Sequence, residues 1–113
     1  MKYLLIGLLA SALLASATMF ATQSRQTFSG TITDGECPIA DHSGMRMGPT
    51  DTACAIACVQ DHGGQFVLFD GKEIYQVSDQ QAAEKFAGRK VTVVGTLDAK
   101  TKMIQVDSIS PSR

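Results

Sequence analysis

Side chains that commonly carry chemistry are scarce in this sequence. It contains no tryptophan, and only three cysteines and two histidines occur among its 113 residues. It has no Ser-His-Asp arrangement, no phosphate-binding glycine loop, no dinucleotide-binding fingerprint and no Cys-x-x-Cys pair. We therefore predict that the protein is not an enzyme.

Clustered basic residues are also missing. The formal net charge is −1 at pH 7, and the densest basic group is Lys85, Arg89 and Lys90. These three flank the expected end of a helix, where cations interact favourably with the helix dipole. Binding to nucleic acid through phosphate neutralisation needs a basic patch or stripe. We expect no nucleic-acid partner.

The longest apolar run lies at the start of the sequence. A positive residue, Lys2, precedes an apolar stretch from Leu4 to Leu14, and Ala15-Ser16-Ala17 follows as a small-x-small cleavage pattern. This order is typical of a secretory signal peptide, and the stretch is shorter than the ~20 residues that a membrane span needs. We expect a signal peptide over residues 1–17, a periplasmic or secreted protein, and no membrane attachment after cleavage. A single-helix anchor is the alternative.

The rest of the chain predicts a small domain rich in β-strands. After a patternless leader (18–26), segments with apolar residues at every second position or in short runs predict five strands, at 27–33, 65–69, 73–77, 91–97 and 103–109. Helix signals cover 53–60, and a capping box of Ser78 with Gln81 predicts a second helix. A helix between the third and fourth of five strands is the connectivity of an OB-fold. We predict one mainly β domain over residues 27–110, an OB-fold-like barrel with a loop-helix insertion between its first two strands.

That insertion holds every cysteine and both histidines. Cys54 and Cys58 are four residues apart on the expected helix, so their Cβ atoms lie about 5–6 Å apart on one face, which is farther than the ~3.8 Å of a disulfide. The same spacing suits two ligands of one metal ion. Thiolates and an imidazole are ligands of Zn²⁺, and Cu(I) also prefers sulfur. Our leading hypothesis is a binding module that holds Zn or Cu through Cys37, His42, Cys54 and Cys58.

Two other uses of the cysteines stay open. Cys37 could bridge to Cys54 or Cys58 and close a loop of roughly 20 residues, which in the chain-entropy description stabilises by ~3 kcal/mol. The protein would then be a disulfide-stapled domain that binds a protein or an envelope glycan without metal, with one thiol left unpaired. Alternatively, a cysteine is redox-active or pairs between chains; Cys54, close to a helix N-terminus, is the candidate.

Other polar or sulfur-bearing residues of the insertion have simpler interpretations. Met45 and Met47 could add soft sulfur ligands for copper, but methionines in a loop often cover apolar surface. His62 follows the helix and is more typical of an exposed helix end. Asp34 and Glu36 could form a carboxylate pair, but turn chemistry explains an Asp-Gly sequence equally well.

Segments that cover nearly all of the chain after the signal carry a resemblance to known proteins: Gly30-Thr31-Ile32-Thr33-Asp34, Cys37, His42, Asp51-Thr52-Ala53-Cys54, Cys58-Val59, Phe66-Val67-Leu68, Lys72 with Tyr75, Phe86-Ala87-Gly88, Val91-Thr92-Val93-Val94-Gly95-Thr96 and Val106-Asp107-Ser108-Ile109. In these segments the sequence resembles a family of small exported bacterial proteins that has no established activity. Its second half is similar to the periplasmic bacterial OB-fold family. The resemblance implies the fold and the export, and it implies no catalytic role.

Overall fold

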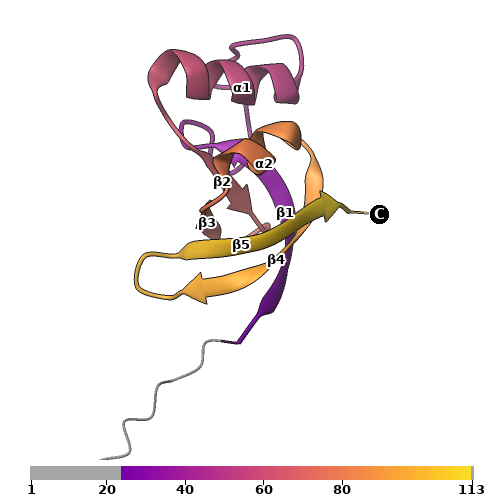
Figure 1. The fold of residues 1–113 in the computed structure, drawn as a ribbon. Helices are drawn as coiled ribbons and strands as arrows, with labels where there is room; N and C mark the ends of the chain where they lie inside the picture. The colour runs from indigo at the N-terminus through magenta and orange to yellow at the C-terminus, as the bar shows by residue number, and fades with distance from the viewer. Residues whose placement is uncertain (1–23, 113) are drawn as a thin grey trace, which may run out of the picture.

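The structure is a computed structural model that describes residues 24–112 (Figure 1). The predicted signal peptide and most of the predicted leader lie outside the described residues. The leader's last residue, Gln26, already belongs to the first strand. The elements in chain order are β1 (Gln26–Asp34), α1 (Asp51–His62), β2 (Phe66–Phe69), β3 (Ile74–Val77), α2 (Gln80–Lys85), β4 (Lys90–Asp98) and β5 (Met103–Pro111).

The five strands form one closed sheet in the order β1-β2-β3-β5-β4, and β4 pairs with β1 to complete it. Neighbouring strands are antiparallel except β3 and β5, which run parallel. The predicted mainly β fold with two helices is therefore confirmed, and all five strands were predicted to within two residues. Figure 1 shows α1 at the end of the sheet where β1 finishes.

The hydrophobic core comes mostly from alternate residues of the strands. Ile32, Leu68, Val91, Val93 and Ile104 are fully buried. The helices add small residues to the same cluster: Ala55 from α1, and Ala83 and Ala87 from α2 and the residues after it. Ile56 and Val59 of α1 pack against this core. Helix α1 is thus fixed to the sheet by apolar contacts alongside its cysteines.

Local signals in the sequence account for both ends of α1. Thr50 is the N-cap, and its side chain accepts a hydrogen bond from the amide of Ala53 at 3.1 Å. Gly63 ends the helix with a φ of 66°, a left-handed conformation that favours glycine. The predicted cap of α2 is wrong, because Asp79 and not Ser78 caps this helix. The Ser78 hydroxyl instead accepts a hydrogen bond from the Val106 amide at 2.8 Å.

The strands have two irregular features. The register of β4 with β5 shifts between Val94 and Gly95, so Asp107 of β5 is left without a partner as a bulge. Gly30 of β1 lies so close to the backbone of Phe69 that a Cβ atom would collide with it. Within residues 24–112, the helices are too short or too polar to span a membrane.

Candidate metal centre

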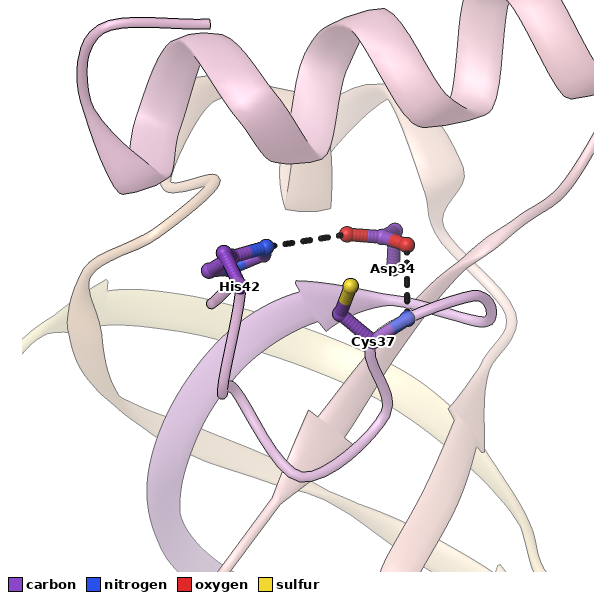
Figure 2. Close-up of side chains that lie close together, drawn as sticks. All are labelled: Asp34, Cys37 and His42. Atoms are coloured by element: carbon purple, nitrogen blue, oxygen red, sulfur yellow. Dashed lines mark hydrogen bonds and ion pairs between the residues drawn. The ribbon is translucent and has the colours of Figure 1, made fainter. Parts of the chain in front are cut away.

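Three side chains converge at the end of β1 beneath α1. Asp34 is the last residue of β1, and Cys37 and His42 follow in the loop that leads to α1. All three are buried, with exposed fractions of 1%, 6% and 4%. Each offers one ligand atom, and these atoms all lie within 4.8 Å of one another. Figure 2 shows the carboxylate, the sulfur and the imidazole gathered in one place under the helix.

The turn after β1 fixes the first two of these residues. One carboxylate oxygen of Asp34, Oδ1, accepts hydrogen bonds from the amides of Glu36 and Cys37, both at 2.9 Å. The Thr33 hydroxyl donates to the Cys37 carbonyl at 2.7 Å. These bonds fold the chain back on the strand end, so that Cys37 lies next to Asp34.

The other side of the centre is not satisfied by hydrogen bonds. Asp34 Oδ2 and His42 Nδ1 are buried and have no hydrogen-bond partner. Among the described residues, they are the two buried side-chain N or O atoms that lack one. They lie 3.8 Å apart, which is too far for a hydrogen bond. A buried polar atom without a partner costs about 1–3 kcal/mol. Two such atoms facing each other beside a thiol would both gain a partner if a metal ion bound between them.

Cys54 and Cys58 of α1 are completely buried near this centre. They do not belong to the group of three whose ligand atoms all lie within 4.8 Å of one another. The Cys54 sulfur contacts the loop between His42 and α1: it donates to the Met45 carbonyl at 3.4 Å and accepts from the Met47 amide at 3.3 Å. The Cys54 sulfur therefore joins α1 to this loop.

The thiols lie in a buried environment close to a negative charge. Burial, and then the charge of Asp34, raise the pKa of Cys58 from 9.0 to about 12. The same two causes, in the same order, raise the pKa of Cys37. Since burial and a nearby carboxylate both disfavour the thiolate, these sulfurs stay protonated near neutral pH unless a cation compensates their charge.

All three cysteines, which lie in the described part of the chain, are free thiols in the structure, and no pair of them is at disulfide distance. The predicted bridge from Cys37 to Cys54 or Cys58 is therefore not formed in this conformation. A surface thiol is absent as well, since Cys37, Cys54 and Cys58 are all buried. This burial removes the exposure that reactive cysteines usually have.

The structure brings together Cys37 and His42 of the four predicted ligands and adds one that the sequence did not single out for this role, Asp34. The available signal was Asp34-Gly35 directly after a strand, for which the sequence offered turn chemistry or a carboxylate pair with Glu36. The turn is confirmed, because one oxygen of Asp34 accepts from the Glu36 and Cys37 amides, while the other oxygen faces His42. Glu36 and His62 are exposed and lie outside the centre.

Comparison of the chain with protein-family models, with curated proteins and with solved structures found no match.

Proposed function

We propose that the protein is a small exported binding module that holds one Zn or Cu ion between the end of β1 and helix α1. Asp34, Cys37 and His42 supply three ligands, and the cysteines of α1 supply the fourth. The observation that carries this proposal is the pair of buried, unpartnered atoms, Asp34 Oδ2 and His42 Nδ1, within 4.8 Å of a thiol.

The donor set favours zinc over copper. Zn²⁺ accepts carboxylate oxygen, imidazole nitrogen and thiolate sulfur in one tetrahedral site, whereas Cu(I) prefers sulfur ligands throughout. With ordinary zinc bond lengths, a tetrahedral ion would hold the Asp34 oxygen and the His42 nitrogen about 3.3 Å apart. Their observed separation is 3.8 Å, so the side chains need to close only slightly. Copper remains the alternative ion.

A binding role, without catalysis, agrees with the burial of the centre. A catalytic zinc site keeps one position open to water or substrate, but all three side chains here are at least nine-tenths buried. The closed strand order and the helix between β3 and β4 support an OB-fold architecture. We propose export to the periplasm or the medium from the signal-like start of the sequence.

The test uses the full-length protein after treatment with a chelator, titrated with Zn²⁺ and separately with Cu(I), and followed by native mass spectrometry and calorimetry. We expect one ion per chain, with zinc held more tightly. His42→Ala should abolish this binding, and His62→Ala, a histidine at the exposed end of α1, should leave it intact. Two matched carboxylate substitutions should show the same contrast. Asp34→Asn should abolish the binding, and Glu36→Gln, at an exposed residue, should leave it intact.

Three results would overturn the proposal. The first is a protein that binds neither ion. The second is binding that survives His42→Ala and Asp34→Asn, which would place the ion elsewhere. The third is a mass two protons below the reduced value in the untreated protein, which would indicate a disulfide and support the metal-free interaction domain.

A further inference from the structure

The side chains of the proposed centre, Asp34, Cys37 and His42, are almost completely buried. Helix α1 lies over them (Figure 2), and its two thiols, Cys54 and Cys58, are buried as well. An ion can therefore enter or leave only if a covering segment moves. Residues 35–50, between β1 and α1, contain no helix or strand, and they carry both Cys37 and His42. This loop is the segment best able to move, because no strand pairing or helix ladder holds it.

The side chains of Thr33 and Asp34 hold the first residues of that loop, and the Cys54 sulfur holds the part that follows His42. It donates a hydrogen bond to the Met45 carbonyl and accepts one from the Met47 amide. Both partners lie a few residues after His42, so the sulfur holds the stretch that follows this ligand. One sulfur thus forms hydrogen bonds with both a donor and an acceptor of the same loop. Without it, these two backbone groups would lose this hydrogen-bond partner.

Packing next to Cys54 reinforces this attachment. Gly48 lies against the first turn of α1, where a Cβ atom would come within 2.8 Å of the Ala53 side chain and 3.0 Å of the Cys54 amide nitrogen. The Arg46–Asp51 ion pair also joins the loop to α1, at 3.4 Å, but both side chains are more than half exposed, and an exposed pair contributes little. The buried contacts around Cys54 are therefore the main attachment.

We infer that the two cysteines of α1 have different tasks: Cys58 is the fourth ligand of the centre, and Cys54 is a latch that holds the Met45–Met47 loop closed over it. This assignment rests on the proposed function, which takes the fourth ligand from the cysteines of α1, and it gives that role to Cys58. Cys54 is a positioning residue, because its sulfur is already engaged by loop backbone.

The surroundings of Cys58 differ from those of Cys54. Cys58 lies one helical turn further along the same face and is fully buried. Its sulfur has no hydrogen bond to the loop backbone among the described residues. The charges that act most strongly on it are those of Asp34 and Cys54, followed by Cys37. Cys58 is thus buried next to Asp34 and Cys54 and, unlike Cys54, is not held by the backbone of the loop.

The test compares Cys54→Ala, Cys54→Ser and Cys58→Ala with the unmodified protein, using Zn²⁺ alone. Competition against a coloured chelator gives the affinity, and stopped-flow transfer of zinc to excess chelator gives the release rate. Cys54→Ala removes both loop hydrogen bonds and should speed release and uptake alike by about tenfold, equivalent to about 1.4 kcal/mol of loop closure. The affinity should then stay within about threefold, since both rates change together. Cys54→Ser keeps a donor and an acceptor and should restore slow exchange.

Cys58→Ala should show the opposite pattern and weaken zinc binding by at least about tenfold, as expected for the loss of a ligand. Equal losses of affinity in Cys54→Ala, Cys54→Ser and Cys58→Ala would make both cysteines ligands and overturn the assignment. Unchanged affinity in Cys58→Ala would overturn it as well. Circular dichroism of each variant confirms that it is folded before rates are compared.

A measurement without metal separates this inference from the proposed function. Hydrogen exchange of the Met47 amide in the chelator-treated protein should be faster in Cys54→Ala than in Cys54→Ser, because only alanine removes its acceptor. If zinc does not bind at all but this difference is found, the result supports the role of Cys54 in holding the loop and contradicts the metal site. If zinc binds and the Met47 amide exchanges equally fast in both variants, the latch fails and the metal site stands.

Discussion

The closed sheet and the insertion between β1 and β2 are stabilised in different ways. The sheet buries aliphatic side chains such as Ile32, Leu68 and Val93 in one core, and its strands pair along their backbones. The end of β1 and the insertion instead bury a carboxylate, an imidazole and three thiols. The two buried side-chain atoms of the described residues that have no hydrogen-bond partner, Asp34 Oδ2 and His42 Nδ1, also lie there. Apolar burial stabilises without a ligand, whereas unpaired polar burial costs free energy until a ligand binds.

This difference predicts that stability and metal binding depend on separate sets of residues. A substitution in the sheet should lower stability with and without metal by the same amount. A substitution in the centre should change the metal-dependent part alone. The predictions below test this separation, from the largest expected effect to the smallest.

Leu68→Ala should destabilise the sheet most. Leu68 is fully buried in β2 opposite Ile32, and removing a buried leucine costs about 2–5 kcal/mol. Urea unfolding with and without zinc should show the same loss in both series, because the centre is untouched. Leu68→Val is the milder control. A loss confined to the zinc-loaded series would contradict the proposed separation.

Asp34→Asn should remove the stabilisation by metal and little else. Asparagine keeps the oxygen that accepts from the Glu36 and Cys37 amides, and its amide nitrogen can face His42. The metal-free free energy of unfolding should change by less than about 1 kcal/mol. The zinc-dependent gain, about 2.7 kcal/mol at a hundredfold excess over Kd, should disappear. A large loss in the metal-free protein would instead indicate that a buried Asp34–His42 ion pair holds the loop.

Alkaline pH should weaken the metal-free insertion through its thiols. The pKa of Cys58 is about 12 in the folded protein and 9.0 when unperturbed. The folded state therefore retains a proton that the unfolded chain releases, so this contribution is complete below pH 9 and is lost as the pH rises towards 12. Cys58→Ala should flatten the fall of the urea midpoint over this range. Tyr75, whose pKa is also raised by burial, is common to both proteins, so an equally steep fall in the variant would contradict the assignment to Cys58.

Ala40→Gly should have the smallest effect and the opposite sign. Ala40 lies between Cys37 and His42 with a φ of 61°, a left-handed conformation that costs a non-glycine residue about 1–2 kcal/mol. Glycine relieves this strain but adds freedom to the unfolded chain, so the net gain should be below about 1 kcal/mol. Lys102→Gly, at a φ of 55° in the β4–β5 turn, is the matched change in the sheet. Thermal unfolding that shows destabilisation by Ala40→Gly would contradict the strained geometry of the loop.

Much of the fold was predictable because its signals are local. The alternation in β1 and β4, the Thr50 cap and the Gly63 stop of α1 each specify an element within a few residues. The cap of α2 was missed because the Val106 amide, a partner distant in sequence, engages Ser78.

The centre was predictable only in part. Cys37 and His42 stand out because cysteine and histidine are common metal ligands. The role of Asp34 depends instead on the strand register, which places it opposite Phe66 at the C-terminal end of β1. The different contacts of Cys54 and Cys58 depend on how the Met45–Met47 loop packs on α1. Neither fact follows from spacing, which puts both sulfurs on one helical face.

X-ray absorption spectroscopy of the zinc-loaded protein tests the central claim most directly, because it reports the atoms bound to the ion. We expect a mixed shell, with sulfur at about 2.3 Å and oxygen and nitrogen at about 2.0–2.1 Å, and an imidazole signal that is unchanged in His62→Ala. A shell of oxygen and nitrogen alone, without sulfur, would mean that the ion is bound away from Cys37 and the thiols of α1 and would contradict the account.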